Sequence, residues 1–369
     1  MRIVVAGGGT GGHLYPGLAI ARALVRLDPA VKPFFVGALR GVEREVLPRT
    51  EFPHELLDLH PLYRSRPWQN WRTLAGAVGA WRRVARLARS EPVRLVVGTG
   101  GYASGLVLAY AAAHRIPAVL QEQNSYPGLT MRAFSRMARE IYLGFPEGGR
   151  HLRPGRSTML VDSGNPIEPP PSPPPDRAKA RAEWSFPPRD GRVLLVVGGS
   201  QGARAVNEAV AAWIDRGLPP GVHVIWATGT ANFESLARYE SKRVRVRAYL
   251  SPIAEAYAAS DLAVGRAGAM TTAELCAWGI PSILIPLPSA AADHQTANAR
   301  ALAAAGAAEW IPQRELTAER LGALAGGLLT DAPRLRALAD AARRRGRPDA
   351  AQNIARRILA LLTRDGSRS

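Results

Sequence analysis

Four glycine-rich turns carry the residue types best suited to holding a phosphate group. They span residues 7–12, 98–102, 198–204 and 265–274, and each lies between a short apolar run and a helical pattern. Small residues let backbone N–H groups approach an anion, and a helix N-terminus adds about half a positive charge. A single turn of this kind is equally well explained by a tight connection that needs glycine. Four of them predict a ligand site at the carboxyl ends of strands in open α/β sheets.

The first turn also fits the Gly-x-Gly-x-x-Gly pattern of dinucleotide-binding proteins. A nicotinamide site requires an acidic residue at the end of the second strand, where it holds the ribose. Residues 36–40 read Val-Gly-Ala-Leu-Arg and supply no acid there. We therefore expect neither NAD nor another cofactor.

Two side chains at these turns are suited to act on a substrate. His13 opens the helix after the first turn, and the positive end of that helix favours the neutral imidazole that a general base requires. Glu274 lies one turn inside the helix of the fourth turn, where it can accept hydrogen bonds from ribose hydroxyls. The alternatives are a structural histidine at a turn and an acid that is favoured near a helix start. Both alternatives stay open at this point.

The elements that must position these residues alternate between strand and helix along the whole chain. We expect strands at residues 2–6, 33–36, 95–97, 118–121, 140–143, 193–197, 222–226, 244–247, 262–264 and 282–285. Apolar residues at helical spacing lie between most of them, as at Leu18, Ala21 and Leu24. The alternation predicts an α/β fold with parallel sheets that helices cover on both faces.

A proline-rich segment at residues 166–175 divides the chain. Such a segment forms neither a helix nor an inner strand, so it predicts a stiff extended connector. We place an N-terminal domain at 1–164 and a C-terminal domain at 165–349. After a crossing segment at 343–348, the last helix, within 350–369, is expected to pack back on the first domain.

Composition narrows the functional classes. The 369 residues include 48 Lys and Arg against 30 Asp and Glu, and the net charge of +18 predicts an anionic partner: nucleic acid, anionic lipid or a phosphorylated substrate. The one cysteine, Cys276, excludes an intramolecular disulfide and a cysteine-built metal site. The N-terminus reads as a strand, and no apolar run approaches the ~20 residues of a spanning helix. We expect a cytosolic protein, or one attached to a membrane from outside.

Several motifs, taken together and in order, resemble one family. They lie at residues 8–17, 98–105, 122–124, 164–166, 198–204, 268–274 and 293–299. They are similar to the signatures of the MurG family of peptidoglycan synthesis. Its members transfer N-acetylglucosamine (GlcNAc) from UDP-GlcNAc to undecaprenyl-diphospho-muramoylpentapeptide (lipid I). The match extends across most of the chain.

The resemblance implies a GT-B fold, in which two Rossmann-like domains face each other across a deep cleft. UDP-GlcNAc would bind mainly the C-terminal domain, and lipid I the N-terminal one. The family pattern implies donor contacts by the backbone around Leu250 at uracil, by Glu274 at the ribose, by Ser200, Ala269 and Met270 around the diphosphate, and by Gln295 with His294 at the sugar. Thr271, Thr272 and Ala273 are further implied donor contacts. The pattern places Thr10, Gly11, Gly12 and Asn124 opposite the donor sugar, and Tyr102, Ser104 and Glu122 at the acceptor.

The implied reaction is a single displacement with inversion, in which the muramoyl 4-hydroxyl attacks C1 of GlcNAc and His13 is the candidate base. The sequence has no Asp-x-Asp pair that would hold a divalent ion, so we expect no metal. Two positions depart from the family pattern: Gln121 stands where a histidine is usual, and Glu168 where many members have arginine. Arg266 or Arg204 is a candidate to replace that cation.

A basic, tryptophan-rich segment predicts contact with a membrane. Between Arg64 and Arg89 there are seven arginines and no acid. Trp68, Trp71 and Trp81 recur at helical spacing, and Arg82 and Arg83 flank the stripe. Such a helix suits the headgroup region of an anionic bilayer. The alternative is an apolar stripe that faces the core beneath a solvated basic face.

These features predict a peripheral enzyme on the cytoplasmic face of the bacterial plasma membrane, with UDP-GlcNAc, lipid I and anionic lipid as partners. Other cell-wall synthesis enzymes are candidate partners. A UDP-GlcNAc 2-epimerase-like isomerase and a GT-B transferase with a different acceptor are the alternative functions. A nucleic-acid-binding protein is not expected, because neither a recognition-helix pattern nor stacking aromatics on strands accompany the charge.

Overall fold

The computed structural model describes residues 1–59, 70–199 and 202–366. Its internal contacts divide the chain into two compact units. The N-terminal unit comprises Met1–Ile167 together with Asp349–Ser369, and the C-terminal unit comprises Glu168–Pro348. The chain thus returns to the first unit after completing the second.

The N-terminal unit is built on one parallel sheet. Its strands are β1 (Arg2–Gly7), β2 (Lys32–Ala38), β3 (His54–Leu57), β4 (Val93–Gly100), β5 (Ala118–Glu122), β6 (Glu140–Leu143) and β7 (Met159–Asp162). Among the described residues they follow the order β3-β2-β1-β4-β5-β6-β7. The order reverses direction between β1 and β4, which are parallel neighbours. In open α/β sheets this switch point is where ligands bind.

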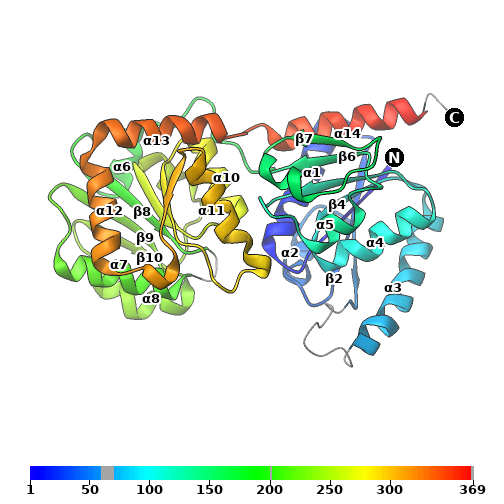
Figure 1. Cartoon of the computed structure of the whole chain (residues 1–369), viewed down its shortest axis with the longest axis horizontal. Coiled ribbons are helices and arrows are strands. Elements are labelled where there is room, and N and C mark those ends of the chain that lie inside the picture. The colour runs from blue at the N-terminus through cyan, green and yellow to red at the C-terminus, as the bar shows by residue number, and fades with distance from the viewer. Residues whose placement is uncertain (60–69, 200–201, 367–369) are drawn as a thin grey trace. The chain divides into compact units, whose positions relative to one another are not determined.

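Helices cover both faces of this sheet, because its strands are apolar on both sides (Figure 1). The helices are α1 (Gly11–Leu27), α2 (Glu43–Val46), α3 (Asn70–Ser90), α4 (Gly101–Ala113), α5 (Leu129–Phe134) and α14 (Ala350–Gly366). Ile3 and Val5 of β1 pack in one cluster with α1 and α14. Val4 and Ala6 alternate to the other face and pack with α3 and α4. This alternation explains why β1 reads as a continuous apolar run.

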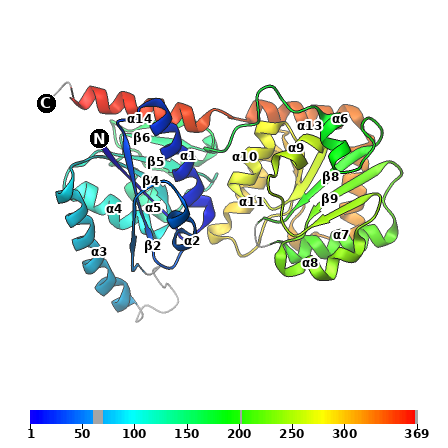
Figure 2. The same ribbon diagram turned by 180° about the vertical axis from the view of Figure 1, so that it is seen from behind.

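The last helix, α14, is part of the N-terminal core. Ile354, Ala355 and Ile358 are fully buried in the cluster that α1 shares with the sheet. Both views show α14 running beside α1 (Figures 1 and 2). Arg357 donates two hydrogen bonds to Glu140 of β6, from Nε to Oε2 at 2.7 Å and from Nη2 to Oε1 at 2.8 Å. Apolar packing and this bidentate pair therefore hold the returning helix to the sheet.

The C-terminal unit repeats the same topology. Its strands are β8 (Arg192–Val197), β9 (Val222–Ala227), β10 (Val244–Arg247), β11 (Leu262–Gly265), β12 (Ser282–Leu284) and β13 (Ala308–Trp310). Among the described residues they form a parallel sheet of order β10-β9-β8-β11-β12-β13. The switch point lies between β8 and β11. Both units are therefore Rossmann-like.

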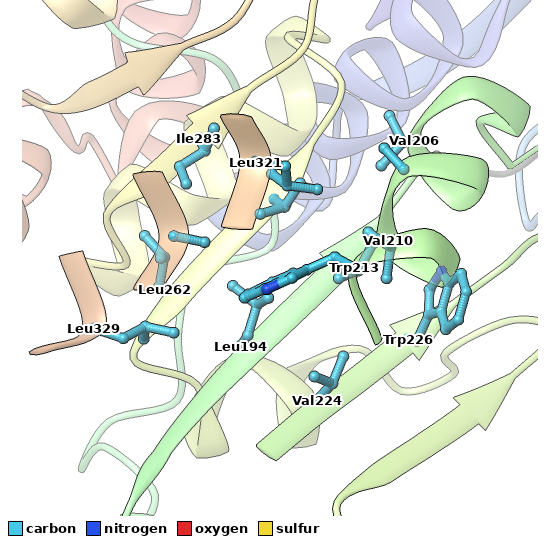
Figure 3. Close-up of a cluster of buried hydrophobic side chains, with 14 of the residues drawn as sticks. Leu194, Val206, Val210, Trp213, Val224, Trp226, Leu262, Ile283, Leu321 and Leu329 are labelled. Carbon is cyan, nitrogen blue, oxygen red and sulfur yellow. The ribbon is translucent and has the colours of Figure 1, made fainter. Parts of the chain in front are cut away.

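Helices again cover both faces of the second sheet. They are α6 (Arg177–Glu183), α7 (Arg204–Arg216), α8 (Thr230–Leu236), α9 (Ala254–Ala259), α10 (Ala269–Trp278), α11 (His294–Ala304), α12 (Ala318–Thr330) and α13 (Ala332–Arg345). On one face, Trp213 of α7 packs beside Leu194 of β8 and Val210 (Figure 3). The alternate residues Val193 and Leu195 face α9 and α10.

The predicted fold class is confirmed, and the differences lie at its edges. Strands β3, β7 and β13 were not predicted; each lies at a sheet edge and has only three or four residues. The expected crossing segment at 343–348 is shorter, because α13 continues to Arg345 and α14 begins at Ala350. Within the described part of the chain, no helix has the length and apolar character needed to cross a membrane.

Candidate functional site

The four glycine turns lie at the two switch points. In the N-terminal unit the first turn follows β1 and the second follows β4, and the Gly8 amide donates to the Gly100 carbonyl at 3.2 Å. In the C-terminal unit the corresponding turns follow β8 and β11, which are also neighbours. The arrangement gives each unit one candidate ligand site at the carboxyl ends of its central strands.

His13 is held by the two turns of the N-terminal unit. Its Nδ1 lies 3.1 Å from Thr10 Oγ1, and its carbonyl accepts a 2.8 Å hydrogen bond from Thr99 Oγ1. The ring lies against Gly100, because a Cβ built there would be 2.7 Å from His13 Cδ2. Thr10 and Gly12 are exposed beside it. A partner on Nδ1 fixes the ring orientation, which a general base needs.

Glu122 is buried beneath the candidate site and does not reach its surface. It is 2% exposed, and its carboxylate accepts hydrogen bonds from the backbone amides of Asn124 at 2.8 Å and Gly128 at 2.9 Å. Burial raises the pKa of Glu122 to about 7, and the hydrogen bonds from Asn124 and Gly128 oppose that rise. The predicted acceptor contact by Glu122 is therefore corrected: the buried side chain holds the turn that carries Asn124.

The second glycine turn carries one further correction. Ser104 is fully buried, and its hydroxyl donates to the Gly101 carbonyl at 3.0 Å, so its side chain does not face an acceptor. Thr130 of α5 donates to the same carbonyl at 3.1 Å. Tyr102 remains half-buried, with its ring edge against Gly9. The turn is thus tied to α5 on one side and to the first turn on the other.

Gln121 belongs to a buried chain of amides. Its Nε2 donates to Asn165 Oδ1 at 3.0 Å, and Asn165 Nδ2 donates to the Gln123 carbonyl at 3.0 Å. Gln123 Nε2 in turn donates to the Thr99 carbonyl at 2.8 Å. All three amide side chains are at most 2% exposed. The residue that departs from the family pattern therefore fastens the end of the N-terminal unit to the second glycine turn.

In the C-terminal unit, Glu274 is oriented by a tyrosine. Tyr257 Oη donates to Glu274 Oε2 at 2.8 Å. Burial raises the pKa of Glu274, while the hydrogen bond from Tyr257 acts in the opposite direction. With one oxygen engaged by Tyr257, the carboxylate is held in a fixed orientation one turn inside α10. This geometry suits an acceptor for a pair of hydroxyls.

The start of α10 presents backbone amides. Gly268 is its N-cap and provides no side-chain cap, and the first turn contains no acidic residue. Met270, Thr271 and Ala273 are partly exposed there. Thr272 is 1% exposed, and its hydroxyl donates to the carbonyls of its own turn, Gly268 at 3.0 Å and Ala269 at 3.1 Å. The Thr272 hydroxyl therefore has a structural role, and the predicted donor contact at Thr272 would have to come from its backbone.

The N-terminal turn of α11 joins the neighbouring loops. Gln295 Oε1 accepts a hydrogen bond from the Leu287 amide at 3.0 Å, after β12. Buried Asn298 donates to the Ala267 carbonyl at 3.1 Å, after β11. His294 Nδ1 lies 2.8 Å from the Ala291 carbonyl. Of the other predicted donor residues, Leu250 is 7% exposed and its side chain lies in the core. Ser200 lies outside the described residues.

Two arginines were candidates to replace the missing cation at Glu168, which is exposed. Arg266 Nη1 donates to the carbonyls of Ile285 at 3.2 Å and Pro286 at 3.3 Å, and burial lowers its pKa. Arg204, at the first turn of α7, pairs with Glu208 at 2.8 Å, and its side chain is 84% exposed. Arg266 is thus fixed at the carboxyl edge of the sheet, whereas Arg204 extends into solvent.

Helix α3 divides its residues between core and solvent. Trp81, which was predicted to contact the membrane, packs edge-to-face on Tyr110 with ring centroids 5.1 Å apart, beside buried Ala80 and Val84. This packing favours the core-facing alternative for Trp81, which is partly exposed, because an apolar stripe at helical spacing serves a core equally well. Arg82 and Arg83 are exposed, and Arg83 pairs with Glu55 of β3 at 3.0 Å. Trp68 and the Trp71 side chain lie outside the described residues.

Sequence reasoning assigned no role to several residues that shape these sites. They are Glu43, Thr99, Gln123, Asn165, Tyr257 and Asn298. Thr99, Gln123, Asn165 and Asn298 lie within the motifs described above, whereas Glu43 and Tyr257 do not. The described residues contain no group of His, Cys, Asp or Glu side chains that could hold a metal ion.

Comparison with known proteins decides the family. The glycosyltransferase family 28 N-terminal domain profile matches residues 3–143, and the C-terminal domain profile matches residues 193–354. A Salinibacter ruber protein named UDP-N-acetylglucosamine--N-acetylmuramyl-(pentapeptide) pyrophosphoryl-undecaprenol N-acetylglucosamine transferase is 42% identical, with 98% of this chain and 97% of that protein covered. The chain belongs to the MurG family of family 28 glycosyltransferases. A Moorella thermoacetica protein of the same name is 38% identical over 97% of this chain and 98% of its own.

Solved structures agree with this assignment. The crystal structure of Acinetobacter baumannii MurG has a TM-score of 0.77 and 26% sequence identity, with 97% of this chain and 99% of that chain covered. The GT-B fold and an activity as a glycosyltransferase follow from this relationship. A UDP-N-acetylglucosamine 2-epimerase structure has a TM-score of 0.63 and 15% identity, and covers 100% of this chain and 96% of its own. That likeness shows the fold alone, so the isomerase alternative is not favoured.

Proposed function

We propose that this MurG-family chain transfers GlcNAc from UDP-GlcNAc to the muramoyl 4-hydroxyl of lipid I, giving the disaccharide lipid II of peptidoglycan synthesis. The observation that carries the proposal is the near-full-length similarity to relatives that are named for this transfer. The candidate sites of the two units support it, because one supplies a fixed imidazole and the other an oriented carboxylate near the start of α10, where no acidic residue lies in the first turn.

The C-terminal unit is the proposed donor site. Glu274, held by Tyr257 at 2.8 Å, accepts hydrogen bonds from the ribose hydroxyls. The diphosphate lies at the start of α10, where the amides of the first turn and the helix dipole stabilise negative charge. Gln295 and the backbone near Leu250 complete the contacts to the sugar and uracil.

The N-terminal unit is the proposed acceptor site. His13 takes the proton of the 4-hydroxyl as that oxygen attacks C1 of GlcNAc from the face opposite UDP, which inverts the anomeric centre. Thr10 orients the imidazole through its contact with Nδ1 at 3.1 Å. Asn124 is presented by the turn that Glu122 holds. Tyr102, in the glycine turn after β4, is a further proposed acceptor contact.

Departure of UDP requires stabilisation of its developing charge. The α10 amides provide it in the ground state and, more strongly, as charge builds in the transition state. Arg266, fixed at the same sheet edge by two carbonyls, adds a positive charge. We propose that the reaction needs neither a divalent metal nor a cofactor.

The acceptor is membrane-linked, and we propose that the chain acts peripherally at the cytoplasmic face of the bacterial membrane. The exposed arginines of α3, including Arg82 and Arg86, offer a basic surface on the same unit as the acceptor site. Anionic lipid contributes about 1 kcal/mol for each nearby cation. Trp81 packs on Tyr110 and is partly buried, so the proposal rests on the arginines.

Transfer of labelled GlcNAc from UDP-GlcNAc to a short-chain lipid I analogue, with and without EDTA, tests the proposal. We expect transfer that is unchanged by the chelator, with product of inverted configuration. Loss of transfer in EDTA would contradict the metal-free mechanism. Epimerised UDP-GlcNAc in place of a transfer product would contradict the proposed function while leaving the fold assignment intact.

A further inference from the structure

Glu43 is a fully buried carboxylate beneath the first glycine turn. It is 0% exposed and begins the short helix α2, which lies beside β2 (Figure 1). Its Oε1 accepts hydrogen bonds from the Gly9 amide at 2.7 Å and from the Ala38 amide at 3.2 Å. The chain has thus placed an internal anion on a glycine turn, where a nucleotide-binding turn would place a phosphate.

The surrounding backbone is shaped to admit this carboxylate. A Cβ at Gly8 would lie 1.5 Å from Glu43 Oε1, and a Cβ at Gly41 would lie 1.9 Å from Oε2. Oε2 is buried, and no side chain or backbone group of the described residues donates a hydrogen bond to it. A buried carboxylate with an unsatisfied oxygen destabilises a fold compared with a neutral side chain of the same shape. A purely structural role would therefore be better served by glutamine.

The Gly9 amide is one residue from the reactive segment. Thr10 follows Gly9 and is the N-cap of α1. Its carbonyl accepts a hydrogen bond from the His13 amide at 3.1 Å, and its hydroxyl lies 3.1 Å from His13 Nδ1. A displacement of Gly9 therefore moves both the helix start and the imidazole's partner. A misplacement of about 1 Å at a reacting group can cost about 10²-fold in rate.

We propose that Glu43 is a positioning residue for the transfer reaction: its carboxylate fixes the first glycine turn and thereby the placement of Thr10 and His13. The proposal rests on the function proposed above. It also accounts for two amides of the first turn, because the Gly8 amide binds the Gly100 carbonyl and the Gly9 amide binds Glu43. A substrate diphosphate on the N-terminal unit must then use groups other than these two amides.

Glu43→Gln is the test variant, since it keeps the shape and an acceptor oxygen but removes the charge. Charge-assisted hydrogen bonds are about twice as strong as neutral ones, so we expect kcat to fall about tenfold. The KM for UDP-GlcNAc and the affinity for UDP should stay within about twofold, and Tm should equal or exceed that of the wild type because a buried charge is gone. Glu45→Gln, an exposed change on the same short helix, is the matched control and should leave kcat unchanged.

A second variant, Glu43→Ala, removes both hydrogen bonds and should lower kcat about 100-fold. Retained affinity for UDP would show that this variant is folded in its C-terminal unit. If the wild type is active and Glu43→Gln is equally active, the proposed role of Glu43 is overturned, while the proposed function of the chain stands. A parallel loss of kcat, Tm and UDP affinity in Glu43→Gln would also overturn the proposed role of Glu43, in favour of a structural role. A wild type without transfer activity would instead refute the proposed function, and the role of Glu43 in the reaction with it.

Discussion

Replacing Glu122 by glutamine tests whether this buried carboxyl group titrates near neutral pH. In the unfolded chain it would lose its proton near the ordinary pKa of 4.5, whereas burial raises its pKa to about 7 in the folded protein. Between these two values the folded state binds more protons than the unfolded state. The free energy of unfolding therefore falls as pH rises through this window, and it stays lower above the folded pKa.

The magnitude follows from the two pKa values. At 1.36 kcal/mol per pKa unit, the difference between 4.5 and about 7 corresponds to a loss of about 3 kcal/mol between pH 4.5 and pH 8. Glutamine does not titrate, so the variant should lack this loss. The substitution also costs about 1–3 kcal/mol at every pH, because its amide group faces the Gly128 amide, which then lacks an acceptor.

The assay is urea unfolding of both proteins at several pH values from 5 to 8, with the exposed change Glu45→Gln as the control. We expect the stability difference between wild type and Glu122→Gln to shrink by roughly 2–3 kcal/mol as pH rises across this range. Glu45→Gln should follow the wild type throughout. Parallel pH profiles for wild type and Glu122→Gln would refute the reasoning, since they would show that Glu122 is ionised at pH 5 despite its burial.

Three further predictions concern other parts of the molecule. His13→Ala should lower kcat by about 10²–10⁴-fold with little change in the KM for UDP-GlcNAc, and near-full activity would rule out a role as general base. Tyr257→Phe should weaken UDP binding, measured by calorimetry, by about 3–10-fold, because Glu274 loses the hydrogen bond that orients it. Arg357→Ala should lower the stability of the N-terminal unit by about 1–2 kcal/mol, because buried Glu140 loses both hydrogen-bond donors and the 38% exposure of Arg357 reduces the cost. An unchanged denaturation midpoint would contradict this prediction.

The sequence could predict the strand–helix alternation and the glycine turns because both are local patterns. The inner strands are apolar on both faces and stand out as runs, as at residues 193–197. The edge strands β3, β7 and β13 are too short for such a run; β7, for example, reads Met-Leu-Val-Asp with largely exposed side chains. Their pairing depends on a neighbouring strand far along the chain, which no local pattern records.

The sequence could not predict in which direction individual side chains point. Ser104 and Thr272 lie in the predicted turns, but each hydroxyl bonds to a carbonyl of its own helix and is buried. Trp81 fits a membrane-facing stripe and a core-facing stripe equally well by periodicity, and only its packing on Tyr110 distinguishes them. Position within a motif therefore predicted the neighbourhood of a residue, but not its contacts.

The residues that hold the site in place were the hardest to find, because their partners are distant in sequence. Glu43 and Gly9 are 34 residues apart, and Gln121 and Asn165 are 44 apart. An acidic residue at the start of a four-residue helix gives no sign that its side chain will be buried. Its burial becomes visible only once two glycines, Gly8 and Gly41, are seen to leave room for it.

The two units share the order of their first six strands, but a buried carboxylate binds a glycine turn of the N-terminal unit. In the N-terminal unit the carboxylate of Glu43 already binds the Gly9 amide, so this turn is organised before any substrate arrives. Helix α1 of the N-terminal unit and α10 of the C-terminal unit both begin without a side-chain cap and without an acid in the first turn, so each helix start is suited to an anion. Because the order of the first six strands is the same in both sheets, the fold alone does not assign donor and acceptor. The difference lies in Glu43, whose carboxylate occupies the Gly9 amide of the N-terminal unit and so favours the proposed placement of UDP in the C-terminal unit.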